Sequence, residues 1–251
     1  MISGYLKDWF SAIGDFTLFS FQVLQGIFSF KFSKARTMEQ MVFLGVHSFN
    51  ITVITAAFVG MSFAFQVVKE FVRFGAGGLV GGILAMAVWR ELGPMMTGAV
   101  LAGRVGAAIS AELGTMKVTE QVDALKSLSQ DIVLYLVCPR VVSLTIMLPL
   151  LIGVADVVGY FSGFLIAYFV GDINPMSFFN STQNMLGVMD VVGGLIKGAF
   201  FGFTIAMLSA YRGLQTRSGA KGVGQSTRRG VVASLIAVFV LNYFLSMVIF
   251  S

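Results

Sequence analysis

Five long apolar runs, separated by short polar segments, dominate the pattern of this chain. We predict a membrane-spanning helix for each run, at about residues 46–68, 79–111, 141–170, 191–210 and 231–250. About 20 apolar residues are enough for a helix to cross a hydrocarbon core about 30 Å thick. The second and third runs exceed this length, so we expect those helices to tilt, break or extend into the cytosol.

The segment before the first run has a different pattern. Within residues 1–35, aromatic and aliphatic residues fall at helical spacing on one side and polar residues lie opposite. The apolar members are Tyr5, Leu6, Trp9, Phe10 and Ile13, and the polar members are Asp8, Ser11 and Asp15. This pattern is typical of a helix in the membrane interface, and the alternative is a poorly ordered tail. Residues 16–30 contain Gln22 and Gln25, and we interpret them as a continuation of this elbow.

The composition agrees with a membrane protein. Of the 251 residues, 57% are hydrophobic and 12% are charged, and the mean hydropathy is +0.87. Soluble domains have roughly 25% charged residues. We therefore predict an all-α polytopic membrane protein with one domain over 1–251, made of an N-terminal elbow over residues 1–45 and a five-span unit over residues 46–251.

The distribution of Lys and Arg predicts the orientation. One side of the predicted membrane has two basic residues in its loops, Lys69 and Arg73. The loops and N-terminal segment of the other side contain Lys7, Lys31, Lys34, Arg36, Lys117, Lys126, Arg140, Arg212, Arg217, Lys221, Arg228 and Arg229. By the positive-inside rule, the N-terminus is cytoplasmic and the C-terminus is outside. The net charge of +5 thus follows from topology and does not call for nucleic-acid binding.

Several classes of site lack the residues they need. One cysteine, Cys138, cannot form an intramolecular disulfide, and one histidine, His47, argues against a metal site. The segment 219–222 is basic and Gly-rich but has the wrong spacing for a phosphate-binding P-loop. The N-terminus also lacks the pattern of a secretory signal. We therefore expect no enzyme and no cofactor bound by this chain, so an ATP-driven process would need another polypeptide.

Small residues recur every fourth position in spans two and four. Span two has two such stripes: Gly98, Ala102, Gly106 and Ser110, and beside it Ala99, Gly103, Ala107 and Ala111. The stripe of span four consists of Gly194, Gly198, Gly202, Ala206 and Ala210. Helices in lipid associate by close backbone approach at such stripes. We predict that both spans lie in the interior and that a stripe serves contacts within the protomer or across a dimer.

Arg90 and Glu91 are charged residues about eleven positions into span two, roughly 15 Å along a helix. Charge at that depth is costly unless it is paired or hydrated. Pro94 removes a helical hydrogen bond nearby and favours a bend. One hypothesis is a polar spot at the base of a lipid-accepting cavity that opens to the outer side. The other is a structural ion pair that locks spans together, and the two are compatible.

Two further charged residues lie in the predicted spans. Lys197, in span four, has no acidic neighbour one turn away, and its candidate partners are Glu91, Asp190 or a lipid phosphate. Because adjacent helical residues point about 100° apart, at least one of Arg90 and Glu91 needs a partner on another helix or on a ligand, and Lys197 is the candidate for Glu91. Asp156, in span three, is explained by an interhelical hydrogen bond or by proton coupling.

Phe71 and Phe74 precede the run Gly75-Ala76-Gly77-Gly78 on the outer side. Aromatic residues beside a flexible loop suit the mouth of a tunnel that receives an acyl chain. They equally suit an ordinary interfacial aromatic belt.

A short amphipathic helix is predicted on the cytoplasmic side, at about residues 118–128. Its apolar positions are Val118, Val122, Leu125 and Leu128, and its other face carries Glu120, Gln121, Asp123 and Lys126. The acidic face has no evident partner in the chain. Such a helix can seat in a soluble partner, or can be a surface helix without one.

Motifs over most of the chain from about residue 43 onward resemble the MlaE/YrbE family of ABC-transporter permeases. They are Arg90-Glu91-Leu92-Gly93-Pro94, Ala102-Gly103-Arg104-Val105-Gly106, Ala111-Glu112-Leu113-Gly114-Thr115-Met116, Glu120-Gln121-x-Asp123-Ala124-Leu125 and Pro139-Arg140. Lys221 stands where the family pattern leads us to expect an acidic residue.

The resemblance implies a permease that moves phospholipids or other lipids between bacterial membranes. It implies a homodimer in the inner membrane, with a cytoplasmic ATPase dimer that binds ATP and Mg and a periplasmic Mce-domain lipid-binding partner. The Arg90-Glu91 position would lie at the lipid cavity, and Glu120, Asp123, Ala124 and Leu125 would contact the ATPase. The alternative is a proton-coupled secondary transporter that uses Asp156 or Glu91, against which the lack of a visible inverted repeat argues.

Overall fold

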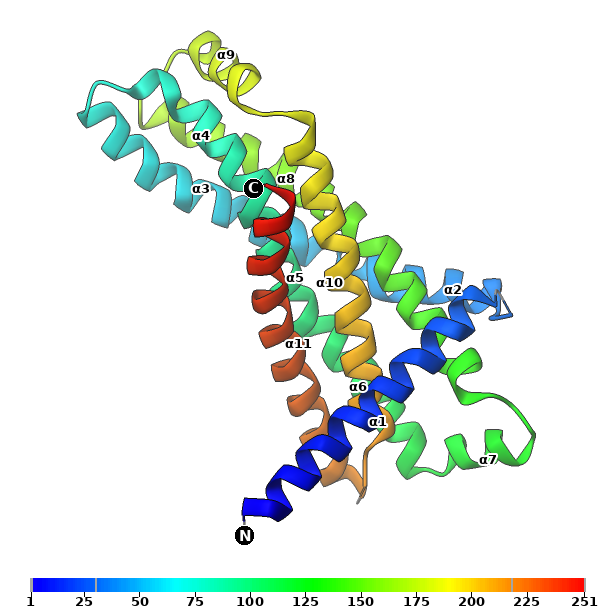
Figure 1. Cartoon of the computed structure of the whole chain (residues 1–251). Helices are drawn as coiled ribbons and strands as arrows, with labels where there is room; N and C mark the ends of the chain where they lie inside the picture. Colours follow the sequence, from blue (N-terminus) through cyan, green and yellow to red (C-terminus); the bar gives the residue numbers. More distant parts are fainter. Residues whose placement is uncertain (1, 30, 218, 251) are drawn as a thin grey trace.

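The computed structural model describes residues 2–29, 31–217 and 219–250, with side chains from residue 14 onward. Within these ranges the chain forms helices and no strand (Figure 1). Five helical runs are long and apolar enough to cross a membrane: Lys34–Arg73, Gly77–Val118, Val133–Phe169, Val188–Leu214 and Gly219–Ile249. Each predicted span falls within one of these runs to within one residue, so the predicted all-α polytopic fold is confirmed.

Most runs are longer than predicted because hydropathy marks only the part of a helix that lipid surrounds. Span one begins with α2 (Lys34–Gln40) and continues through a π-helical turn and a 3₁₀ turn into α3 (Phe49–Arg73). The hydroxyl of Ser33 caps α2 by accepting a hydrogen bond from the backbone N–H of Arg36. The polar residues of α2 thus extend span one beyond its apolar part.

Span two is interrupted twice without losing its helical course. It consists of α4 (Val80–Ala87), α5 (Gly93–Leu101) and α6 (Ala107–Val118), joined by the π-helical turns Val88–Leu92 and Ala102–Gly106. A π-helical turn widens the helix locally and is frequent at functional sites. The first turn contains Arg90 and Glu91 and directly precedes Pro94, where the sequence predicted a disturbance of the helix.

The elbow is α1 (Ile2–Phe28), which runs obliquely across the cytoplasmic ends of the spans (Figure 1). The rings of Phe16 and Phe19 lie 5.1 and 5.4 Å from the ring of Tyr211, between centroids. This helix is not among the five that meet the length and composition of a span, in agreement with an elbow. The side chains predicted to lie at the interface, from Tyr5 to Ile13, precede the first described side chain at residue 14.

The remaining helices are α7 (Gln121–Ser127), α8 (Cys138–Phe169), α9 (Pro175–Met185), α10 (Val188–Leu214) and α11 (Gly219–Ile249). The sequence analysis predicted no helix between spans three and four, yet α9 occupies that position on the outer side. Asn174 caps it by accepting from the N–H of Met176 at 2.8 Å. The helix packs on α4, where Gly81 and Gly82 leave no room for a larger side chain.

The first small-residue stripe of span two and the stripe of span four pack inside the chain. The second stripe of span two is the exception, because Gly103 has open space around it. A Cβ built on Gly98 would lie 3.0 Å from Phe201 of α10, and one on Gly106 would lie 2.9 Å from the Ser209 hydroxyl. Gly198 meets Pro149 of α8, and Gly202 meets Leu144 of the same helix. Other members of these two stripes are packed as well: Ala102 of span two is buried, and Gly194 of span four lies against Trp89.

Candidate functional site

Lys197 is the buried centre of a charged cluster in the outer parts of spans two, four and five. Its ammonium donates to the carbonyl oxygen of Arg90 at 2.6 Å and to the carboxylate of Glu91 at 3.0 Å. A third hydrogen bond joins it to the hydroxyl of Ser246 at 2.7 Å. Pro94 has no N–H to bond the Arg90 carbonyl four residues earlier, so Lys197 satisfies an acceptor that the proline leaves free.

Glu91 accepts hydrogen bonds from two helices at once. Besides Lys197, the hydroxyl of Ser246 donates to its Oε1 at 2.6 Å, and the amide of Asn242 donates to its Oε2 at 2.6 Å. The predicted pairing of Glu91 with Lys197 is therefore confirmed. Sequence reasoning missed Asn242 and Ser246, although their one-turn spacing in an otherwise apolar span was a signal that both face the same side.

Arg90 points to a different partner. Its Nε lies 2.7 Å from Oδ1 of Asp190, which is buried, and the second oxygen of Asp190 accepts from the N–H of Gly187 at 2.8 Å. Asp190 thus fastens the start of α10 to span two. Of the two acidic candidates for Lys197, Asp190 is therefore excluded, because its carboxylate pairs with Arg90.

The cluster combines fixed and open groups. Two cations and two carboxylates balance, and each charge is paired, so the site avoids the cost of isolated charge in a membrane. Lys197 is fully covered, whereas the side chains of Arg90 and Glu91 are 37% and 40% exposed. In the protomer, therefore, Lys197 lines no open surface, and Arg90 and Glu91 are the groups that a ligand can reach.

Phe71 and Phe74 do not join this cluster. Phe74 is 78% exposed at the end of α3, and Phe71 packs on the outer core beside Val68. From Leu79, just after their loop, to Glu91 the helix rises roughly 18 Å at 1.5 Å per residue. The structure therefore brings Arg90, Glu91 and Lys197 together and leaves the two aromatic residues apart.

Asp156 is buried in α8 beside Gly93, whose lack of a side chain makes room for the carboxyl group. Its Oδ1 accepts no hydrogen bond from any described residue, so the interhelical hydrogen bond predicted for Asp156 is not made through this atom.

On the cytoplasmic side, the predicted amphipathic helix is shorter than expected. Val118 ends α6, Glu120 adopts a left-handed conformation with φ of 61°, and α7 begins only at Gln121. The left-handed residue breaks the helical course, so Val118 and Val122 do not share one helix. On α7, Val122 is buried, Leu125 is half-buried, and Glu120, Asp123 and Ala124 are exposed.

The acidic face of α7 has a partner, contrary to expectation. Lys117, in the last turn of α6, donates to both oxygens of Asp123 at 2.8 and 2.9 Å, and Lys126 lies at 4.0 Å. The hydrogen bond from Lys117 lowers the pKa of the Asp123 carboxyl below its ordinary value. Asp123 thus ties α7 to α6, and Glu120, the residue just before α7, forms no ion pair with a described residue.

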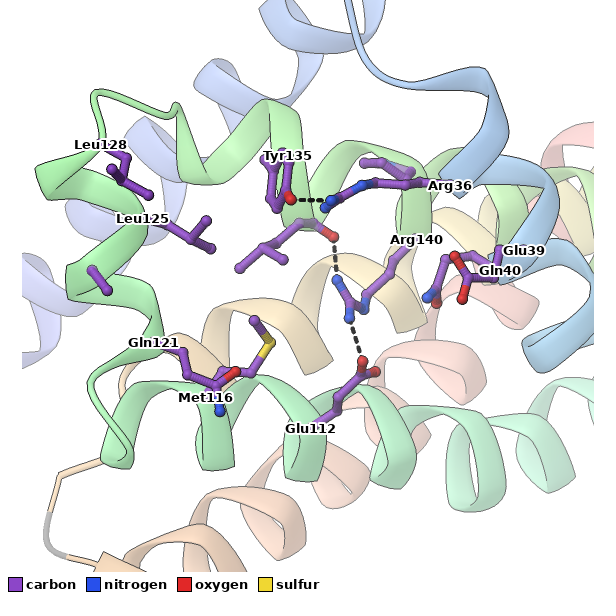
Figure 2. Close-up of a pocket in the computed structure, with 13 residues that line it drawn as sticks. Arg36, Glu39, Gln40, Glu112, Met116, Gln121, Leu125, Leu128, Tyr135 and Arg140 are labelled. Atoms are coloured by element: carbon purple, nitrogen blue, oxygen red, sulfur yellow. Dashed lines mark hydrogen bonds and ion pairs between the residues drawn. The ribbon is translucent and has the colours of Figure 1, made fainter.

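A pocket of about 520 Å³ lies between α7 and the helices behind it (Figure 2). Gln121, Ala124, Leu125 and Leu128 line it from the α7 side, and α2, α6 and α8 form the other walls. Across it, Arg140 of α8 forms an ion pair with Glu112 of α6 at 2.7 Å. The candidate coupling residues Ala124 and Leu125 therefore border the pocket, and Leu125 also packs against the core.

Comparison with known proteins identifies the family. The model of the family described as Permease MlaE matches residues 37–248. This chain belongs to the MlaE permease family. It is 45% identical over 245 residues to a probable ABC transporter permease protein of Synechocystis, covering 98% of this chain and 93% of that protein. A probable ABC transporter permease protein of Rickettsia typhi is 40% identical, over 95% and 92% of the two chains.

A third relative comes from a plant. The Arabidopsis thaliana protein TRIGALACTOSYLDIACYLGLYCEROL 1, chloroplastic, is 40% identical over 225 residues, which cover 90% of this chain and 64% of that protein. The family resemblance seen in the sequence is confirmed. This MlaE-family protein is a multi-pass permease subunit of an ABC transporter, a transport subunit rather than an ATPase.

Proposed function

We propose that this permease moves phospholipids or related lipids between membranes. It lies in the bacterial inner membrane as a homodimer, and a cytoplasmic ATPase dimer binds ATP and Mg and drives the cycle. A periplasmic Mce-domain protein exchanges lipid with it at the outer side. An ABC permease without a phosphate-binding loop of its own requires an ATPase partner.

The observation that carries the lipid assignment is the partial exposure of Arg90 and Glu91, whose ion-pair partners Asp190 and Lys197 are buried. Lys197 lies nine residues after Val188, the first residue of α10, roughly 14 Å along the helix. A polar site at that depth, surrounded by apolar spans, suits an amphiphile with a charged head and apolar tails. The Arg90 guanidinium is a preferred partner of phosphate oxygens. The Arabidopsis relative, whose name contains that of a glycerolipid, supports the same substrate class.

The homodimer is supported by the second small-residue stripe of span two. Gly103 is exposed, and no atom lies within 4 Å of a Cβ built on it. Ala99, Ala107 and Ala111 of the same stripe are only half-buried in the protomer. Close helix approach at this face by a second copy would use a stripe that the protomer leaves unpacked.

The test is reconstitution of the purified transporter, with its co-purified subunits, in lipid vesicles. We expect an ATPase to co-purify and lipid transfer to require ATP hydrolysis. Transfer should be unchanged when a protonophore collapses the proton gradient. Transfer that requires the gradient and proceeds without ATP would instead support the secondary transporter, with Asp156 as its first candidate proton site.

A further inference from the structure

Glu112 and Arg140 belong to motifs of this chain to which the lipid site and the ATPase contact assign no role. Arg140 is in the first turn of α8, at the start of span three, and Glu112 is near the end of span two. The Arg140 side chain is 5% exposed and also donates to the carbonyl of Leu136 at 2.6 Å. Arg140 is thereby fixed to its own helix while it reaches across the pocket to Glu112 (Figure 2).

The two helices that this ion pair joins share one main packing partner and differ in the other. Helix α6 packs mainly on α10 and α11, whereas α8 packs mainly on α3 and α10. Between them, beside α7, lies the 520 Å³ pocket. The Glu112–Arg140 ion pair is thus a direct link between the ends of spans two and three across a space that side chains do not fill.

Helix α7 is attached in a way that allows it to move as a unit. Left-handed residues flank it at both ends, Glu120 with φ of 61° and Ser129 with φ of 57°. Neither is a glycine, so each end is a break in the helical course that the backbone adopts at a cost. Val122 anchors the helix in the core, whereas Gln121, Ala124, Leu125 and Leu128 line the pocket behind it.

We propose that the Glu112–Arg140 ion pair is a positioning contact that makes spans two and three move together when α7 is displaced. The proposal rests on the proposed function, in which the ATPase displaces α7. Only Thr119 and Glu120 separate α7 from α6, so a displacement reaches span two directly. The ion pair then transmits this displacement to span three. Without the pair, the cytoplasmic end of span two moves without that of span three.

The two members of the pair differ in exposure. Glu112 is 43% exposed, whereas the Arg140 side chain is 5% exposed, so loss of the carboxylate leaves a mostly buried cation and costs some stability. After Glu112→Ala, the Arg140 guanidinium keeps its bond to the Leu136 carbonyl and gains water from the pocket. We therefore expect folding and ATPase binding to survive this substitution.

The first experiment measures lipid moved per ATP hydrolysed by the complete transporter in vesicles. Glu112→Ala should lower this ratio at least fivefold while the ATPase still co-purifies and the melting temperature falls only in part, because Arg140 keeps its bond to the Leu136 carbonyl. The matched control is Glu39→Ala, which removes another carboxylate of the same pocket that has no ion-pair partner among the described residues. In this control the ratio of lipid moved to ATP hydrolysed should be unchanged.

A charge reversal tests the pairing itself. Glu112→Arg alone should lower the ratio of lipid moved to ATP hydrolysed, and the double variant Glu112→Arg with Arg140→Glu should restore much of it.

A distance measurement keeps the proposal testable if the reversal variants do not fold. Spin labels at Thr115 and Ile146, in a Cys138→Ser background, report the separation of spans two and three with and without trapped ATP. In the wild type the separation should stay constant through the cycle, and in Glu112→Ala it should change.

A wild-type ratio and a constant separation in Glu112→Ala would overturn the proposal. The failure of the proposed function looks different, because wild-type vesicles would then show no ATP-dependent lipid transfer at all.

Discussion

The outer end of span two and its cytoplasmic end are built in contrasting ways. At the outer end, Lys197 is buried and makes three hydrogen bonds, and Asp190 fastens Arg90 from a neighbouring helix. At the cytoplasmic end, α7 lies between two left-handed residues and in front of a 520 Å³ pocket. The paired charges hold the outer site in one geometry, whereas the cytoplasmic helix has room to change position.

The difference suits a permease in which force and substrate act at opposite ends. A rigid polar cluster can hold a headgroup in a defined place, because its side chains are already oriented by their partners. A helix that receives force from another subunit needs the opposite property. The following substitutions test whether rigidity at one end and mobility at the other are both required.

Glu91→Lys should have the largest effect, because it removes the partner of Lys197 and places a second cation beside it. Breaking one partner of a buried ion pair costs about 3–5 kcal/mol. We expect transport to be abolished and the melting temperature to fall. Glu91→Gln keeps hydrogen-bonding capacity toward Asn242 and Ser246, so its loss should be mild. Equal transport by both variants, measured in vesicles, would contradict the role of the charge.

Gly202→Leu should disturb the rigid part through packing alone. A Cβ at this position would lie 2.9 Å from the backbone carbon of Leu144, so a leucine forces α10 and α8 apart. Overpacking of this kind costs about 1–3 kcal/mol. The thermal midpoint in detergent should fall. Gly103→Leu is the matched control, because Gly103 has open space in the protomer. It should leave the protomer folded and lower the dimer content, and an unchanged dimer content would remove this face from the interface.

Leu125→Asp should affect coupling far more than stability. Leu125 is half-buried at the edge of the pocket, where a carboxylate can stay hydrated. We expect lipid-stimulated ATP hydrolysis to fall about tenfold, equal to about 1.4 kcal/mol of coupling free energy, with the spans intact. Ser127→Asp adds the same charge to an exposed position of α7 and should retain stimulation. Normal stimulation in Leu125→Asp would argue that α7 does not seat in the ATPase.

The smallest effect concerns the Lys117–Asp123 ion pair. Because the pKa of Asp123 is lowered in the folded protein, the pair stabilises the position of α7 above the ordinary Asp pKa of about 3.9. That contribution is lost as the pH falls through the lowered folded pKa. The mobility of a spin label at Ser127 should therefore be constant between pH 8 and pH 5 and rise only below about pH 4. In Lys117→Gln the label should already be mobile at neutral pH; equal mobility there would show that the pair does not hold α7.

The sequence predicts the spans well because the cost of exposing polar backbone and charge to lipid leaves a strong pattern. The same cost predicts that Lys197 is the ion-pair partner of Glu91, since a charge within a membrane requires a partner. Helix α9 was missed because it is short and mostly polar on its exposed side, and nothing in a hydropathy pattern distinguishes such a helix from a loop.

Details of the site were harder to predict for specific reasons. The π-helical turn at Arg90 and Glu91 changes which directions the two side chains take, and no residue type announces it. The break at Glu120 uses a left-handed conformation at a non-glycine residue, so the predicted helix continued through it. Asn242 and Ser246 carry no charge, and polar residues of this kind are tolerated in spans for many reasons.

The most direct test of the account is photo-crosslinking at position 91 in the assembled transporter. A photoreactive amino acid there should capture lipid, and the yield should change when ATP is bound and trapped. The control position is Phe58, which is exposed on the lipid-facing side of α3 and should capture bilayer lipid independently of ATP. Lipid capture at position 58 alone, with none at position 91 in any state, would contradict the assignment of the Arg90–Glu91 cluster as the lipid site.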